Sequence, residues 1–143
     1  MKKVILLIVM FFTLNSCQSQ DNIVITFDKL PSKAQTFVKS NFPNMTVLQV
    51  VKDKDLFDKD YTVYFNEGSK VEFNKKGDWT EIEIKSGIPT FVLHSSINAF
   101  ISKNHPNTNV IDITKDKKEY EVKLSNSIEI KFKLSGEFIR YED

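Results

Sequence analysis

One stretch of this sequence occurs twice, first at Leu30–Glu83 and again at Leu93–Glu142. At an offset of 63 residues the identical pairs include Ser32/Ser95, Phe37/Phe100, Asn41/Asn104, Pro43/Pro106, Asn44/Asn107, Val47/Val110, Lys52/Lys115 and Asp53/Asp116. Beyond Asp60 the offset becomes 59, and the pairs are Tyr61/Tyr120, Val63/Val122, Phe73/Phe132, Gly77/Gly136 and Glu83/Glu142. The first copy therefore has four extra residues within Asp53–Asp60, which fits a loop because an insertion there costs little closure entropy. Since each copy is long for a solenoid unit, the repeat predicts two half-domains that share one core.

Each copy opens with apolar residues at helical spacing. In the first copy the apolar stripe consists of Leu30, Ala34, Phe37 and Val38, at positions i, i+4, i+7 and i+8. Pro43 ends this helix, because the residue before a proline avoids the α region. The repeat predicts the second helix at about Ser95–Asn104.

The rest of each copy alternates apolar and polar residues, which is typical of strands separated by short turns. The expected strands are Thr46–Lys52, Tyr61–Asn66, Ser69–Asn74, Trp79–Ile84, Asn109–Lys115, Glu119–Ser125, Ser127–Lys133 and Glu137–Glu142. Ile23–Phe27 is a further strand candidate outside the repeat. Because short turns join antiparallel neighbours, the pattern predicts an α+β domain with one antiparallel sheet of about eight strands and helices on one face.

The alternation also assigns side chains to the two faces of the sheet. The apolar set predicted to face the helices is Tyr61, Val63, Phe65, Val71, Phe73, Ile82, Ile84, Tyr120, Val122, Leu124, Ile130, Phe132 and Tyr141. The opposite, open face is predicted to carry Gln49, Thr62, Tyr64, Lys70, Glu72, Asn74, Trp79, Glu81, Glu83, Asp112, Glu121, Lys123, Glu129, Lys131, Lys133, Phe138 and Arg140. Aromatic and arginine side chains anchor many protein interfaces. The candidate protein-binding residues are Tyr64, Trp79, Glu81, Lys123, Lys131, Phe138 and Arg140.

Two of these aromatic residues have an alternative interpretation. Trp79 and Phe138 occupy equivalent positions after Gly77-Asp78 and Gly136-Glu137, where each ring could cap its own hairpin. We favour this packing role for Phe138. For Trp79 the packing role and the binding role stay equally open, because tryptophan is strongly enriched among binding hot spots.

The N-terminus has the features of a bacterial lipoprotein signal. Lys2 and Lys3 precede the apolar run Val4–Leu14, which is shorter than the ~20 residues that a membrane-spanning helix needs. Leu14-Asn15-Ser16-Cys17 then resembles a lipobox, although Asn15 is unusual at its position. The alternative is an ordinary secretory signal cut nearby, with Cys17 incidental. The expected organisation is a signal peptide (1–16), a tether with a possible strand (17–29), and one domain (30–143) made of repeats 30–85 and 93–143. The mature protein is expected to be anchored by its lipid to a membrane of the bacterial envelope, at the periplasm or the cell surface.

Charge and cysteine content exclude some function classes. The chain has 20 basic and 19 acidic residues, and loss of residues 1–16 removes only Lys2 and Lys3 among them, leaving 18 basic and 19 acidic. This balance argues against a nucleic-acid partner and against electrostatic attraction to anionic lipid. Membrane attachment is therefore expected through the N-terminal lipid only. With Cys17 as the single cysteine, the fold is expected to depend on packing and not on an intrachain disulfide.

The sequence gives little support for catalysis, a cofactor or a metal. His94 and His105 lack the spacing of a metal or nucleophile site, and a pair such as Glu81 and Glu83 is ordinary on a solvated sheet. Asp53, Asp55, Asp58 and Asp60 lack the turn glycine and the distal glutamate of an EF-hand loop. We therefore predict no enzyme activity, no cofactor and no metal site.

Several short motifs in the mature chain resemble one family. They are Leu-Pro-x-x-Ala-x-x-Phe-Val (30–38), Asn-Phe-Pro-Asn (41–44), Lys-Asp-Lys (52–54), Tyr-Glu-Val-Lys-Leu-Ser-Asn (120–126), Glu-Ile-Lys-Phe (129–132) and a Gly-aromatic step. The chain resembles the PepSY-like, β-lactamase-inhibitor-like family of secreted bacterial proteins over Leu30–Tyr141. The resemblance implies a tandem helix-plus-sheet fold with a concave sheet face and a role in binding or inhibiting proteins. Ser127 departs from the glycine that this family usually has at its position.

These observations favour a non-enzymatic envelope lipoprotein that binds another protein through the open sheet face. The partner could be a secreted or periplasmic peptidase or β-lactamase that the protein inhibits. The alternative is a structural or assembly lipoprotein without inhibitory activity. A carrier of small ligands is disfavoured, because the predicted open face is too charged for a mostly apolar pocket.

Overall fold

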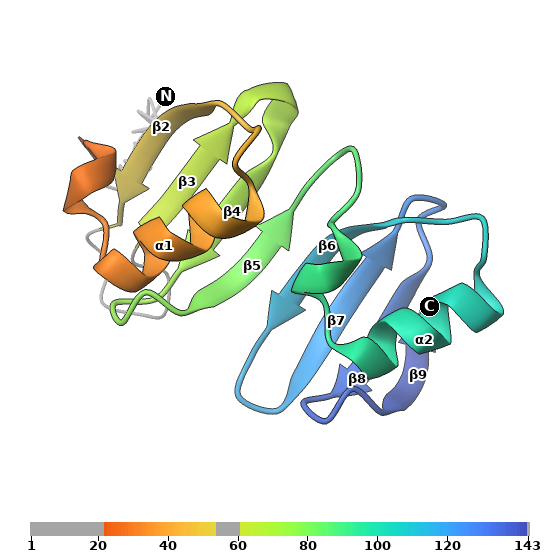
Figure 1. Cartoon of the computed structure of the whole chain (residues 1–143). Coiled ribbons are helices and arrows are strands. Elements are labelled where there is room, and N and C mark those ends of the chain that lie inside the picture. Colours follow the sequence, from red (N-terminus) through yellow and green to blue (C-terminus); the bar gives the residue numbers. More distant parts are fainter. Residues whose placement is uncertain (1–21, 54–60, 143) are drawn as a thin grey trace, which may run out of the picture.

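The computed structural model describes residues 22–53 and 61–142, which form an antiparallel sheet with two α-helices on one of its faces (Figure 1). The helices are α1 (Ser32–Asn41) and α2 (Ser95–Asn104), and short 3-10 turns occupy η1 (Phe27–Lys29), η2 (Asn66–Gly68) and η3 (Thr90–Val92). The strands are β1 (Ile23–Ile25), β2 (Val47–Lys52), β3 (Tyr61–Phe65), β4 (Lys70–Phe73), β5 (Trp79–Glu83), β6 (Val110–Lys115), β7 (Glu119–Leu124), β8 (Glu129–Lys133) and β9 (Phe138–Glu142).

The nine strands lie in the sheet in chain order, and each neighbouring pair is antiparallel. The prediction of an α+β fold with one antiparallel sheet is confirmed. The predicted number of about eight strands is too low, because β1 pairs with β2 from Ile23↔Lys52 to Ile25↔Val50 and adds a ninth strand at the edge. The helix α2 begins 63 residues after α1, and β9 begins 59 residues after β5.

The hydrophobic core lies between the helices and the sheet. Ala34 and Val38 of α1, like Ile97 and Ile101 of α2, are buried against it. The segment between the halves joins the same core, since Ile88 is buried and its amide donates to the carbonyl of Val110 at 2.7 Å. The buried residues of the helices, the strands and this connecting segment thus belong to one hydrophobic core.

The β7–β8 turn contains a residue in an unfavourable backbone conformation. Ser127 has φ +70°, whereas the equivalent turn in the first half has Gly68 with φ +73°. The left-handed region costs a residue with a Cβ about 1–2 kcal/mol, and glycine avoids that cost. We expect Ser127→Gly to raise the free energy of unfolding by about 0.5–1 kcal/mol, because the greater freedom of glycine in the unfolded chain offsets part of the gain.

Urea denaturation measures this effect, and Ser135→Gly provides the matched control. Among described non-glycine residues only Glu67 and Ser127 have positive φ, so Ser135 gains nothing from glycine and its variant should be less stable than the wild type. If Ser127→Gly were destabilising as well, strain at Ser127 would not be the controlling factor.

Candidate binding surface on the open sheet face

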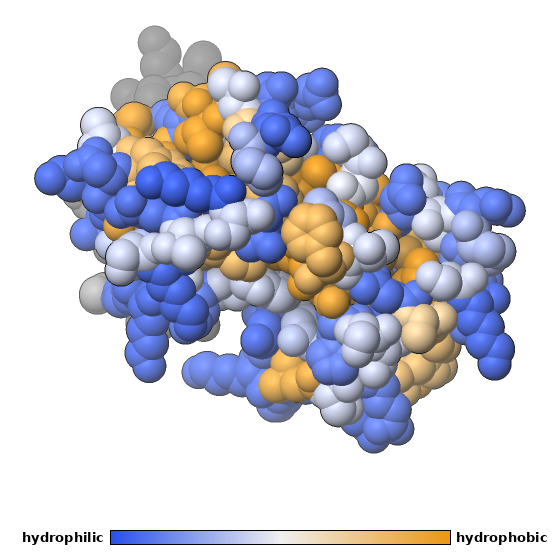
Figure 2. All heavy atoms as spheres, in the orientation of Figure 1, coloured by the Kyte–Doolittle hydropathy of each residue, from blue (hydrophilic) through white to orange (hydrophobic). Residues whose placement is uncertain are grey.

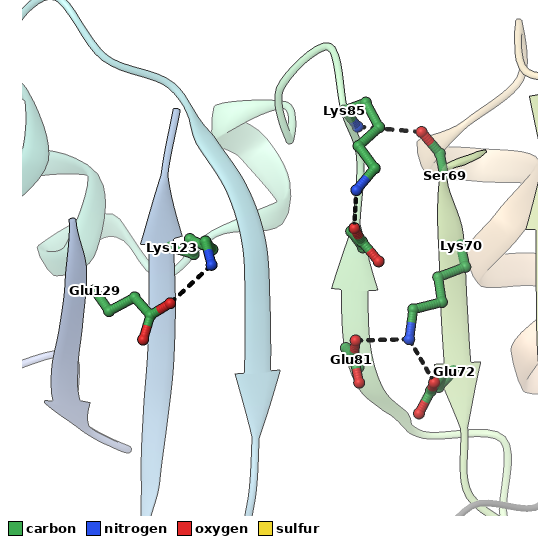
Figure 3. Close-up of polar contacts among 8 residues, drawn as sticks. Ser69, Lys70, Glu72, Glu81, Lys85, Lys123 and Glu129 are labelled. Atoms are coloured by element: carbon green, nitrogen blue, oxygen red, sulfur yellow. Dashed lines mark hydrogen bonds and ion pairs between the residues drawn. The ribbon is translucent and has the colours of Figure 1, made fainter. Parts of the chain in front are cut away.

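The face of the sheet opposite the helices carries rows of ion-paired side chains. Among the described residues, neither α-helix covers it (Figure 1). On β4 and β5, Lys70 Nζ lies 2.8 Å from Glu72 Oε1 and 2.8 Å from Glu81 Oε1 (Figure 3). Burial by itself lowers the pKa of Lys70, but its hydrogen bonds to Glu72 and Glu81 outweigh burial and raise that pKa above its ordinary value. Lys70 is therefore a fixed cation near the middle of the face.

An excess of negative charge lies where the two halves meet. The strands β5 and β6 pair Glu81 with Thr114 and Glu83 with Asp112. Oxygens of Glu81, Glu83 and Asp112 lie within 4.8 Å of one another. Burial, together with repulsion from Glu81 and Glu83, raises the pKa of Asp112 to about 6. Acidic side chains often cluster in this way without an ion, so we assign no metal to this cluster.

The raised pKa of Asp112 should make the free energy of unfolding depend on pH. Because its folded-state pKa of about 6 exceeds the ordinary 3.8, the charged carboxylate destabilises the fold above pH 6, and this cost disappears as pH falls toward 4. The side chain is partly exposed and screened by solvent. We therefore expect Asp112→Asn to raise the free energy of unfolding by about 1 kcal/mol at pH 8 and by much less at pH 4.

Urea denaturation of both proteins at pH 8 and pH 4 measures the difference. Glu67→Gln, which removes an exposed carboxylate from the β3–β4 turn, is the control for loss of a negative charge. An effect of Asp112→Asn that is equal at the two pH values would contradict the proposed repulsion at the junction of the halves.

Three of the predicted binding residues lie in a second group of ion pairs, on β7 to β9. Lys131 Nζ is 3.0 Å from Glu119, 3.3 Å from Glu142 and 3.8 Å from Glu121. Further ion pairs of 2.8 Å join Arg140 to Glu142 and Lys123 to Glu129 (Figure 3 shows the second). The open face thus brings Glu81, Lys123, Lys131 and Arg140 together as one charged surface, and their binding role stays a prediction.

Tyr64 lies toward the β1 side of the same face. It is 40% exposed and pairs with Lys70 on β4 and with Gln49 on β2. On the adjoining edge strand, Val24 pairs with Val51 and is 61% exposed. The first three strands therefore add an exposed apolar region to a surface that is otherwise charged.

The prediction that Trp79 and Phe138 lie on the open face is wrong. Irregular register between Glu72 and Phe73, and between Lys131 and Phe132, places Trp79 opposite Phe73 and Phe138 opposite Phe132. Both rings consequently pack against the core. Strict alternation could not reveal the two bulges, because one inserted residue reverses the face of every residue beyond it.

The contacts of these two rings show what they do in the fold. Phe138 stacks on Phe100 of α2, with ring centroids 4.7 Å apart, which agrees with the favoured packing role. Trp79 stacks on Tyr120 of β7, with centroids 6.2 Å apart. Trp79 therefore links the first half of the sheet to the second.

Both histidines have structural contacts at the ends of α2. His94 is the N-cap, and its Nδ1 accepts a hydrogen bond of 3.2 Å from the amide of Ser96. His105 follows the last turn, with Nε2 3.0 Å from the hydroxyl of Tyr141. Sequence reasoning missed the capping role of His94, because histidine is not among the common N-cap residues.

Three predicted features lie in parts of the chain that the structure does not describe. The signal peptide and the lipidation residue Cys17 lie outside the described residues, and so do residues 54–60 of the aspartate-rich loop. Among the residues that are described, no helix is long and apolar enough to cross a membrane.

Similar proteins share this architecture. The family model described as "Putative beta-lactamase-inhibitor-like, PepSY-like" matches residues 17–58 and 59–140. A solved structure of a "putative calcium-regulated periplasmic protein" from Bacteroides thetaiotaomicron is 37% identical, with a TM-score of 0.82 over 86% of this chain and 98% of that one. A Bacteroides vulgatus protein described as periplasmic is 40% identical, with a TM-score of 0.81 over 87% and 99% of the two chains. A second protein from that species, described as periplasmic and of unknown function, is 30% identical, with a TM-score of 0.79 over 85% and 99%. None of the curated protein sequences matches the chain.

Proposed function

The chain belongs to the PepSY-like, β-lactamase-inhibitor-like family, and on that premise we propose that it is a non-enzymatic protein-binding module of the bacterial envelope. In this proposal a lipid on Cys17 holds it to a membrane, and the open sheet face binds the partner. The periplasmic description of similar proteins supports the location. One observation carries the proposal, namely a broad sheet face that neither α-helix covers and whose charged side chains are held in ion pairs.

The dimensions of this face suit a protein partner. Nine strands at ~4.8 Å spacing span roughly 40 Å, and five-residue strands are about 17 Å long. A standard protein interface buries about 800 Å² on each partner, which is close to this extent. The open face is therefore large enough for a complete interface without help from the helices.

The side chains on the face are also suited to binding. Lys70 and Lys131 are only 23% and 18% exposed and each contacts two or more carboxylates, so little side-chain freedom remains to be lost when a partner docks. Fixed charges of both signs select a complementary partner and set its orientation. Tyr64 and Arg140 are more exposed and are the candidate anchors.

We propose that the partner is a secreted or periplasmic enzyme, such as a β-lactamase or a peptidase, and that binding inhibits it. The description of the family supports this choice. A lipoprotein that only supports the assembly of an envelope complex would bind without reducing any enzyme activity, so a stoichiometric activity titration separates the two roles.

The first experiment compares two variants of the mature chain carrying Cys17→Ser. One variant combines Tyr64→Ala with Arg140→Ala on the open face. The matched control combines Phe91→Ala with Lys103→Ala, both exposed and away from the β-strands. We expect the wild type and the control to bind an envelope enzyme and reduce its activity at one-to-one stoichiometry, and the open-face variant to bind at least tenfold more weakly. Equal binding by all three folded proteins would contradict the proposed surface.

Lipid anchoring has its own test. Radioactive palmitate should label the wild-type chain in cells and should not label Cys17→Ser. Labelling of neither protein would indicate an ordinary secretory signal, and would leave the binding proposal to be decided by the activity titration.

A further inference from the structure

A cleft separates the two halves at one end of the sheet. The register of β5 and β6 runs from Glu83↔Asp112 to Glu81↔Thr114, and among the described residues no strand pair continues it toward Trp79 and Lys115. This junction cleft has a volume of about 960 Å³, and Figure 2 shows a notch between the halves at the lower edge of the molecule. Ligand pockets commonly measure ~300–1,000 Å³. The cleft is thus large enough for several residues of an extended peptide.

An aromatic ring and a cation lie side by side in the lining of the junction cleft. Trp79 belongs to the lining, and its ring is partly exposed while it stacks on Tyr120 at an interplanar angle of 22°. Lys115, at the end of β6, places its Nζ 5.6 Å from the centroid of the Trp79 ring and 5.7 Å from that of Tyr120. The cleft therefore offers an apolar contact surface with a positive charge beside it.

Two acidic residues in the lining of the junction cleft share one cationic partner. Glu72 and Glu81 both lie 2.8 Å from the Nζ of Lys70. On the rim, Asp78 forms an ion pair with Lys33, so this side adds no net charge. Lys70 thus compensates only part of the negative charge of Glu72 and Glu81, and the Lys33–Asp78 pair adds no net charge to the rim.

The β6–β7 turn on the other rim has a surplus of positive charge. Asp116 Oδ1 accepts hydrogen bonds of 2.6 Å from the amide of Lys118 and 2.9 Å from that of Glu119, and these bonds lower the pKa of Asp116. The carboxylate of Asp116 thus stabilises the β6–β7 turn through hydrogen bonds to its backbone. Lys115, Lys117 and Lys118 are exposed, and none forms an ion pair with an acidic side chain in the described part of the chain.

We infer that the junction cleft binds an acidic peptide segment of a partner protein, with carboxylates at Lys115, Lys117 and Lys118 and an apolar side chain against Trp79. Charge complementarity selects the acidic peptide, and the exposed part of the Trp79 ring supplies the apolar contact. This binding site goes beyond the proposed function, because it is separate from the open-face anchors Tyr64 and Arg140. The two sites can therefore be tested independently.

The test uses the chain purified from envelope membranes in detergent. The probe is a fluorescein-labelled peptide, Glu-Glu-Phe-Glu-Asp-Glu, whose binding is followed by fluorescence anisotropy. Trp79 is the only tryptophan in the chain, so its emission reports contact within the cleft. We expect saturable binding accompanied by a change in Trp79 emission. We expect no binding of the peptide Lys-Lys-Phe-Lys-Arg-Lys.

Two double variants locate the site. Lys115→Gln with Lys118→Gln should weaken binding of the acidic peptide about tenfold, because both cations face the cleft. Lys39→Gln with Lys103→Gln changes the net charge equally at exposed positions on the helices and should bind like the wild type. Tyr64→Ala with Arg140→Ala should also retain the peptide, even if the open-face proposal fails.

Several results would overturn the inference. They are absence of saturation up to about 1 mM peptide by a folded protein, equal weakening by the two lysine double variants, unchanged Trp79 emission at saturation, and equal binding of the basic peptide. Binding of anionic phosphatidylglycerol vesicles through the same lysines, without peptide binding, would assign the cleft to lipid and overturn it as well.

Discussion

Replacing Phe132 with alanine is expected to lower the free energy of unfolding by about 4 kcal/mol. The Phe132 side chain is 0% exposed on β8. Its ring meets Phe100 of α2 edge to face, with centroids 5.3 Å apart, and meets Phe138 of β9 at 6.2 Å. The variant would lose the burial of the ring, two aromatic contacts and part of the packing of α2. A loss of this size is a large fraction of the ~5–15 kcal/mol by which proteins of this kind are stable.

Urea denaturation measures this loss, and two further variants serve as comparisons. Phe73 is the repeat equivalent of Phe132, is also 0% exposed and contacts Phe37 of α1 at 5.8 Å, so Phe73→Ala should cost about as much. Phe91 is 71% exposed, and Phe91→Ala should change stability by less than about 0.5 kcal/mol. If Phe132→Ala cost less than about 1 kcal/mol, the α2–sheet interface would not be a core of the kind described.

Replacing Gly136 with alanine is expected to cost about 3 kcal/mol. Gly136 has φ +82° in the β8–β9 turn, where any residue with a Cβ costs about 1–2 kcal/mol. The added Cβ would also clash with Nδ1 of His94 and lie 2.9 Å from Cβ of Ser96. Because His94 is the N-cap of α2, relief of the clash would disturb the hydrogen bond from the amide of Ser96, and loss of a cap costs about 1 kcal/mol.

Gly68→Ala separates the cost of the left-handed backbone conformation from the cost of the clash with His94 and Ser96. Gly68 has a similar φ of +73°, but the nearest atom to its added Cβ is Cε of Lys85 at 4.0 Å, so only the conformational cost of about 1 kcal/mol applies. Urea denaturation of both variants gives the difference between them. Equal losses would mean that the turn around Gly136 does not press against the start of α2.

The order and bounds of the regular elements were predictable from local pattern. Helical spacing located α1 and α2, and alternation located the repeat strands to within one or two residues of their observed ends. The repeat strengthened each assignment, because a segment that is ambiguous in one copy has a counterpart in the other. The buried set followed too, since apolar residues at equivalent positions of both copies face the helices, Phe73 and Phe132 among them.

The candidate binding surface was predictable only in part. The charged residues Glu81, Lys123, Lys131 and Arg140 lie on the open face with Tyr64 as the alternation predicted. The positions of Trp79 and Phe138 could not be predicted from alternation. The bulges that turn these rings toward the core depend on how each hairpin packs against its neighbours. Sequence period alone carries no information about that packing.

By itself, then, the sequence determined the α+β class and the separation of apolar from charged faces, because each depends on periodicity within a short segment. Only the tertiary structure decided the contacts between the halves. The approach of Asp112 to Glu81 and Glu83, and the junction cleft beside Trp79 and Lys115, both depend on how β5 and β6 pair and where their register ends. That pairing joins segments about thirty residues apart, and it is fixed by packing of the shared core and not by either segment alone.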